Sequence, residues 1–166
     1  MVILIRATVY AALFIGFLLV FLPARVIEWS GIAAPSQFGI AQVLGAVLAA
    51  AGAILAVSCI VTFAVIGRGT PAPFDPPRRL VVRGPYRFVR NPMYVGAGAA
   101  LLGAALYYES LQLALYAAGF LLVMELFVRL YEEPTLRKTF GSAYDDYCRR
   151  VGRWWPRPAA RSGPPG

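Results

Sequence analysis

The feature that most constrains this chain is a stretch at residues 39–66 that contains no charged residue. A helix needs about 20 mostly apolar residues to cross the hydrocarbon core of a bilayer. This stretch exceeds that length, so its helix is expected to tilt or to project beyond the bilayer. With 59% hydrophobic and 14% charged residues, the whole composition is that of a membrane protein rather than a soluble domain.

Three further apolar segments suit membrane helices. Residues 2–22 carry a single charge, residues 93–108 form a shorter run, and residues 111–131 are apolar until Glu125. Together with residues 39–66, they predict an all-α, polytopic membrane protein with about four transmembrane helices and a short C-terminal amphipathic helix. A signal peptide is the alternative for residues 2–22. A retained helix is favoured, because its loss would leave an odd number of spans.

Basic residues crowd the loop at residues 67–91 and the segment after the last span, whereas the other two connections carry almost none. The positive-inside rule places both termini and the long loop in the cytoplasm, and we expect a multi-pass protein of the plasma (inner) membrane. The formal charge of +8 fits this topology and attraction to anionic headgroups, so we expect membrane lipids and no nucleic acid as partners. The basic residues are Arg68, Arg78, Arg79, Arg83, Arg87 and Arg90 in the loop, and Arg137, Lys138, Arg149, Arg150, Arg153, Arg157 and Arg161 after the last span.

The chain contains no histidine. This excludes a histidine general base, a Ser-His-Asp triad and any histidine-based metal site, and we expect no bound metal. Cys59 lies within an apolar segment and Cys148 lies in the basic tail, without a Cys-x-x-Cys motif. We therefore expect no disulfide between them.

The loop at residues 67–91 leads into the third apolar segment and contains five prolines, which exclude a continuous helix. Asn91 is expected to cap the third helix, with Pro92 at its first position, where no amide donor is needed. The amide groups and the positive dipole end of this helix are then free to meet an anion near the bilayer surface.

The C-terminal part is expected to turn back on itself. We expect a turn at Pro134 and a helix end at Gly141. Ser142 and Asp145 predict a capping box for a last short helix, which lies on the membrane surface or folds back over the loop. The apolar stripe of that helix is Tyr144, Tyr147, Cys148 and Val151, and the residues beyond it that suit the headgroup region are Trp154 and Trp155.

The sharpest anomaly is an ionisable face on the fourth helix. Glu125, Arg129 and the pair Glu132 and Glu133 recur at spacings of three and four, which places them on one face. Ionisable groups within a span are costly and usually face a polar interior or cavity, so this face indicates a site. The alternatives are a structural pair of Glu125 with Arg129, and a helix whose acidic end is simply leaving the membrane.

A second cluster stands at the start of the third helix. Arg90 and Asn91 precede the helix, and Tyr94, Gly96 and Gly98 lie in its first turns. The arginine suits a carboxylate or a phosphate, although positive-inside topology also explains basic residues here. The tyrosine suits stacking on a base or a place at the membrane interface, and the glycines leave room for a ligand or for a neighbouring helix.

Residues 84–156 carry a long, ordered pattern that resembles the isoprenylcysteine carboxyl methyltransferase and phospholipid methyltransferase family of integral membrane enzymes. The one departure from the family pattern is Asn91, where histidine is usual. Asparagine keeps a polar contact but does not carry a proton. The matching residues are Gly84, Pro85, Tyr86, Arg90, Pro92, Tyr94, Gly96, Glu132, Glu133, Leu136, Phe140, Gly141, Tyr144, Tyr147, Val151, Arg153 and Pro156.

The resemblance implies S-adenosyl-L-methionine as the cofactor and an in-line transfer of its sulfonium methyl group. Within that framework Arg129 is the candidate for orienting an acceptor carboxylate and Glu133 for fixing Arg129, which makes these two the expected catalytic residues. The cofactor-binding residues that it implies are Tyr86, Arg90, Asn91, Pro92, Tyr94, Gly96, Gly98, Glu132 and Glu133.

The expected function is carboxyl O-methylation of an isoprenylcysteine-like or other amphiphilic acceptor, a lipid-like or prenylated small molecule. A carboxylate is already ionised at neutral pH, whereas an amine must first lose a proton, so phospholipid N-methylation is the alternative. A non-catalytic membrane scaffold that retains the fold is the rival from another class. Residues 1–157 are expected to form one membrane domain, with residues 67–156 as its cofactor-binding half and residues 158–166 as a disordered tail.

Overall fold

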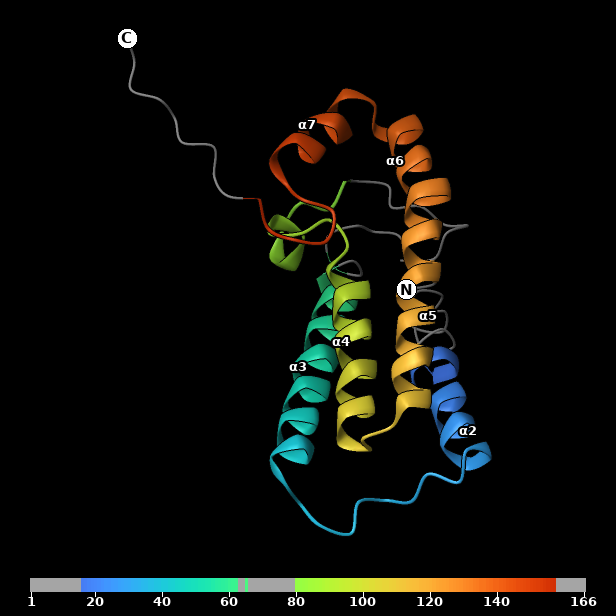
Figure 1. The fold of residues 1–166 in the computed structure, drawn as a ribbon. Helices are drawn as coiled ribbons and strands as arrows, with labels where there is room; N and C mark the ends of the chain where they lie inside the picture. Colours follow the sequence, from blue (N-terminus) through green and yellow to red (C-terminus); the bar gives the residue numbers. More distant parts are fainter. Residues whose placement is uncertain (1–15, 63–64, 66–79, 158–166) are drawn as a thin grey trace.

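The structure is a computed structural model that describes residues 16–62, 65 and 80–157 (Figure 1). Over these residues the regular elements are helical, which confirms the all-α prediction. Residues 158–166 and most of the first expected span lie outside the described residues. In chain order the elements are a π-helical segment Gly16–Phe21, α2 (Leu22–Trp29), α3 (Ile40–Thr62), a 3-10 turn Gly84–Arg87, α4 (Pro92–Tyr107), α5 (Leu111–Phe127), a π-helical segment Val128–Glu132, α6 (Glu133–Phe140) and α7 (Ser142–Arg150).

Two of the described helices are long and apolar enough to cross a membrane. They are α3 and the continuous helix Leu111–Phe140, which α5, the π-helical segment and α6 form together. The third apolar segment forms α4, a shorter helix of 16 residues. The outward faces of these helices are apolar, as at Val47, whose exposed fraction is 61%. Such a face is what a helix presents to lipid.

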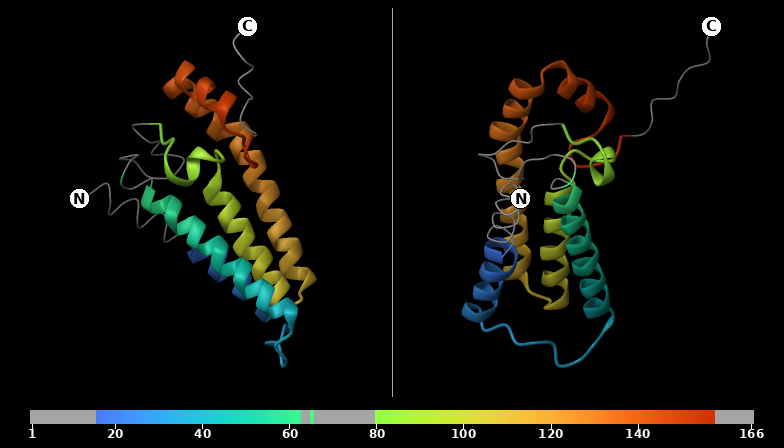
Figure 2. Two further views of the ribbon diagram at one scale, coloured as in Figure 1. Left: turned by 90° about the vertical axis from the view of Figure 1, so that its left-hand side faces the viewer. Right: turned by 180° about the vertical axis from the view of Figure 1, so that it is seen from behind.

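Small residues hold α3 and α4 together, and Figure 2 shows the two helices side by side from both directions. A Cβ atom on Gly52 would lie 2.5 Å from the backbone nitrogen of Ala100 and 2.5 Å from the carbonyl oxygen of Gly96. Glycine is therefore required for this spacing, as is usual where membrane helices approach closely. Gly45, seven residues before Gly52, faces α4 in the same way, because positions seven apart return to nearly the same face of a helix.

The helix that begins at Leu111 does not turn at Pro134, contrary to the sequence expectation. Pro134 lies in the first turn of α6, directly after the π-helical segment Val128–Glu132. Proline has no amide to donate within a helix, and the change from π-helical to α-helical hydrogen bonding at this point lets the chain continue as one helix. The reversal comes at Gly141, as expected, where φ is +54° and glycine adopts the left-handed conformation without strain.

The last helix folds back over the loop that precedes α4 (Figures 1 and 2). Its expected inner stripe is confirmed, because Tyr144 and Tyr147 are buried and the Tyr147 hydroxyl donates to the carbonyl oxygen of Tyr86 at 2.6 Å. The expected capping box is wrong. Ser142 is the first residue of the helix rather than its cap, and Asp145 accepts a hydrogen bond from Arg137 at 3.1 Å.

Tyr116 ties the described N-terminal part of the chain to α5. Its hydroxyl donates to the carbonyl oxygen of Leu18, in the segment Gly16–Phe21, at 2.6 Å. We expect Tyr116→Phe to lower the free energy of unfolding by about 0.5–1.5 kcal/mol, the usual contribution of such a bond. A lower thermal unfolding midpoint in detergent would show this, and an unchanged midpoint would contradict it.

Candidate active site

A cavity lies where the start of α4, the end of the long helix Leu111–Phe140 and α7 meet. It holds about 570 Å³ of space, which includes open solvent. Val81, Met93 and Leu136 line its apolar side. Its polar lining comes from Arg90, Asn91, Glu132 and four tyrosines, Tyr86, Tyr94, Tyr144 and Tyr147. Residues that are far apart in the sequence thus share one hollow.

The central electrostatic feature of the site is a buried carboxylate held by two arginines. Arg90 lies 3.2 Å from Glu133, and their side chains are only 9% and 8% exposed. Arg153 donates to both oxygens of the same carboxylate, at 2.7 and 2.9 Å. Bidentate pairing of this kind is strong and fixes geometry. The start of α4, which Arg90 precedes by two residues, and the C-terminal part of the long helix, which carries Glu133, therefore lie close together.

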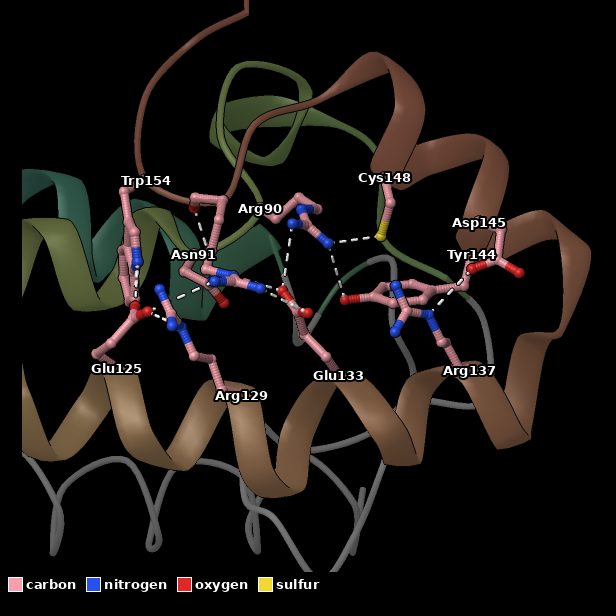
Figure 3. Close-up of polar contacts among 11 residues, drawn as sticks. Arg90, Asn91, Glu125, Arg129, Glu133, Arg137, Tyr144, Asp145, Cys148 and Trp154 are labelled. Carbon is pink, nitrogen blue, oxygen red and sulfur yellow. Dashed lines mark hydrogen bonds and ion pairs between the residues drawn. The ribbon is translucent and has the colours of Figure 1, made fainter.

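The ion-pair network continues along the long helix to Glu125 (Figure 3). This carboxylate pairs with Arg129, accepts from the Trp154 indole and lies 3.4 Å from Arg153. The expected structural pair of Glu125 with Arg129 is thus present. Glu133, however, binds Arg90 and Arg153 instead of Arg129. The π-helical segment between the two positions widens the helical turn and changes their angular offset.

Glu132 faces the cavity. Its carboxylate accepts a hydrogen bond from the Tyr94 hydroxyl at 3.1 Å, and Tyr94 is buried in α4. Adjacent glutamates therefore have different roles. Glu133 anchors the arginines, and Glu132 presents an acceptor to the interior of the site.

Asn91 stands at the N-cap position of α4, but its side chain does not cap the helix. Its ψ of 53° lies outside the extended region that capping residues usually adopt. The side-chain amide instead donates to the carbonyl oxygen of Arg153 at 3.3 Å. The expected cap is therefore wrong in its contact, although Pro92 takes the expected first position of the helix.

The implied cofactor-binding residues divide into two groups. Tyr86, Arg90, Asn91, Tyr94 and Glu132 line the cavity, and Glu133 reaches it through Arg90. The remaining three, Pro92, Gly96 and Gly98, lie outside its described lining. Gly96 packs on α3, where an added Cβ would lie 2.7 Å from the carbonyl oxygen of Gly52, and Gly98 packs on Leu121 of α5.

The sequence did not predict that α7 and the residues after it contact Arg90 and Glu133 in the site. Tyr144 and Cys148 both contact the Arg90 guanidinium, and burial raises the pKa of Tyr144, which keeps its phenol neutral. The hydrogen bond to Glu133 raises the pKa of Arg153. Trp154, expected among the headgroups, packs against the helical core, while Trp155 is exposed. The motif around Arg153 was the available signal, but its partners are tertiary.

The described part of the chain shows no candidate metal site. Among the described residues, no set of three histidine, cysteine, aspartate or glutamate side chains is placed to bind an ion. The acidic groups face arginines and a tyrosine hydroxyl instead. The arrangement suits the binding of a polar ligand that carries both charges.

Comparison with known families gives an assignment. The family model described as phospholipid methyltransferase matches residues 40–143, from the start of α3 to the first residues of α7. No curated protein and no solved structure gives a significant match. The match covers more than half of the chain and includes both helices that meet at the cavity. The chain therefore belongs to the phospholipid methyltransferase family, in the group of membrane methyltransferases that also contains the isoprenylcysteine carboxyl methyltransferases.

Proposed function

We propose that this protein binds S-adenosyl-L-methionine in the cavity and transfers its methyl group to a carboxylate of an amphiphilic, lipid-like acceptor. Methyltransferases of this family use that cofactor. The observation that carries the proposal is the convergence of Arg90, Tyr94 and Glu132 on one hollow, with Glu133 anchoring Arg90 from behind.

The residues present fit the cofactor. An ammonium group or ribose hydroxyls need an acceptor, and Glu132 presents one. A carboxylate needs a cationic donor, and Arg90 lines the cavity; its buried Nε atom has no hydrogen-bond partner among the described residues. An adenine ring needs flat apolar surfaces, which the tyrosines of the lining supply. Pro92, Gly96 and Gly98 then serve the site by setting the position of α4.

The chemistry asks little of the protein beyond placement. When bound, the cofactor supplies a methyl group on a cationic sulfonium, and a carboxylate oxygen forms the new bond to carbon as the sulfur keeps the old bonding pair. Positioning and electrostatics are then the main contributions of the chain. Glu132 and Arg90 would bind and orient the cofactor. No proton moves, so a chain without histidine is suited to the task.

Phospholipid N-methylation is the second candidate. The description of the matching family model favours it. An amine acceptor must lose a proton before attack, and Glu132 is the carboxylate of the lining that faces the cavity. A non-catalytic scaffold that retains the fold is the remaining alternative, and an absence of cofactor binding would favour it.

We also propose the expected topology of four spans, with both termini in the cytoplasm and the plasma (inner) membrane as the location. Residues 80–91, which carry Arg83, Arg87 and Arg90, and the basic helices α6 and α7 lie at one end of the bundle (Figure 1). The positive-inside rule assigns that end to the cytoplasm. A water-soluble cofactor would then enter from the cytosol, and a lipid-like acceptor from the bilayer.

Arg129 is proposed to orient the acceptor. Its side chain is 60% exposed and pairs with Glu125, outside the described lining of the cavity. We therefore expect Arg129→Ala to lower turnover at least tenfold while the affinity for S-adenosylhomocysteine changes less than threefold. Calorimetry and steady-state kinetics would separate the two. Equal losses in both would place Arg129 in the cofactor site.

A labelling experiment tests the reaction itself. The purified protein is incubated with S-adenosylmethionine labelled in the methyl group and with total membrane extract. Label that base releases as methanol supports carboxyl O-methylation. Base-stable label in the lipid fraction supports N-methylation instead, and absence of both cofactor binding and transfer points to the scaffold.

A further inference from the structure

We propose that residues 152–154, the C-terminal strap, hold the cofactor-binding residues in place, and that Arg153 is the positioning residue of this strap. The inference rests on the proposed function and deepens it. None of the expected site residues lies in the strap, and the family match ends at residue 143, although Arg153 belongs to the sequence pattern that resembles the family.

The strap is attached to the start of α4 through the backbone. The amide of Arg90 donates to the carbonyl oxygen of Gly152 at 2.8 Å, and the amide of Asn91 donates to that of Arg153 at 3.3 Å. Val89 and Gly152 form an isolated parallel β-bridge. The side chain of Asn91 adds a second bond to the carbonyl oxygen of Arg153. Arg90 and Asn91, which both line the cavity, are therefore hydrogen-bonded to the strap.

The strap is attached to the long helix through side chains. Arg153 binds Glu133 bidentately and lies 3.4 Å from Glu125, two glutamates eight residues apart on that helix. The Trp154 indole donates to Glu125 as well. A single arginine thus bridges α4 to two points of the helix that carries Glu132.

Arg153 and Arg90 share the carboxylate of Glu133, so loss of Arg153 should affect Arg90. Arg153 occupies both oxygens of Glu133, and the same carboxylate holds Arg90. Without Arg153, Glu133 keeps Arg90 as its cationic partner but loses the bidentate contact that fixes the orientation of its carboxylate, and with it that of the Arg90 pair. Arg153 itself lies outside the described lining of the cavity. It acts through Glu133 and Arg90, so its loss should weaken cofactor binding more than the rate of transfer.

Three variants test this, with Arg149→Met as the matched control. Arg149 is 72% exposed and pairs with Asp146 on the outer side of α7. Arg153→Met removes the bridge. Arg153→Lys keeps the charge but loses the bidentate geometry. Gly152→Ala keeps every charged group, but its Cβ would collide with the carbonyl oxygen of Trp155 and displace the strap.

Calorimetry with S-adenosylhomocysteine and steady-state kinetics give the readouts. We expect Arg153→Met to raise Kd and the KM for S-adenosylmethionine at least tenfold while kcat changes less than threefold. Lysine should restore part of the affinity, and Gly152→Ala should weaken binding at least threefold. Combining Arg153→Met with Glu133→Gln should cost less affinity than the two single losses added together, because both act on one contact.

Each outcome decides a separate claim. Affinities of the Arg153 variants within twofold of the Arg149→Met control would overturn the role of the strap. Equal effects on KM and kcat would overturn positioning in favour of a direct role. If Arg153→Met does not fold, the lysine variant decides, and an unchanged Kd there overturns the inference. Failure of the wild type to bind refutes the proposed function instead.

Discussion

Replacing Glu133 with glutamine is expected to reduce the affinity for S-adenosylhomocysteine by roughly 100-fold and to destabilise the fold. The carboxylate is 8% exposed and pairs with both Arg90 and Arg153. Removal of one partner from a buried ion pair leaves uncompensated charge and typically costs about 3–5 kcal/mol. Because about 1.4 kcal/mol corresponds to a tenfold change in affinity, even part of this cost accounts for the expected loss of binding.

Glu28→Gln is the matched control for this experiment. It also breaks an arginine–glutamate pair, with Arg25, but at a site where the side chains are 42% and 63% exposed. Exposed pairs of this kind contribute about 0–1 kcal/mol. Calorimetry and thermal unfolding in detergent should therefore distinguish the two variants clearly. Similar behaviour of Glu133→Gln and Glu28→Gln would show that the buried pair does not organise the site.

Gly52→Ala is expected to cause a large loss of stability from a single added methyl group. The new Cβ would lie 2.5 Å from backbone atoms of α4, which no side-chain rotation can relieve. The helices must then separate, and overpacking of this kind costs about 1–3 kcal/mol. Each kcal/mol lowers the unfolding midpoint of a chain of this size by about 2–4 °C.

Gly119→Ala is the control for the packing prediction. Gly119 lies in α5, and an added Cβ there meets nothing within 4 Å. Alanine is also the better helix former, so its midpoint should stay level or rise. A Gly52→Ala midpoint equal to that of Gly119→Ala would contradict the tight packing of α3 on α4.

The sequence predicted the helices well because their signals are local. Apolar runs set α3, α4 and α5, and Gly141 ended α6 where a positive φ was needed. The acidic face of the fourth helix indicated the site because charge is expensive in an apolar segment. The convergence of Arg90 with Glu133 followed from placing both at the same end of the bundle.

The details that failed depend on contacts between distant segments. Asn91 was expected to bond its own helix, but the carbonyl oxygen of Arg153 takes its amide. Pro134 was expected to form a turn, but it lies within a helix after a π-helical segment that the local sequence does not predict. Arg153 stood in the sequence as a basic residue of the tail and a member of the family pattern, but its partners Glu125 and Glu133, 28 and 20 residues away in the chain, could not be predicted locally.

Titration of the purified protein with S-adenosylhomocysteine tests most directly whether the two helix ends form one cofactor site. The expected result is saturable binding of about one ligand per chain, weakened by Glu132→Gln, which alters the acceptor in the cavity, and unchanged by Glu28→Gln. Folded protein that takes up no ligand, or that binds it undiminished with both Glu132 and Glu133 replaced, would contradict the account.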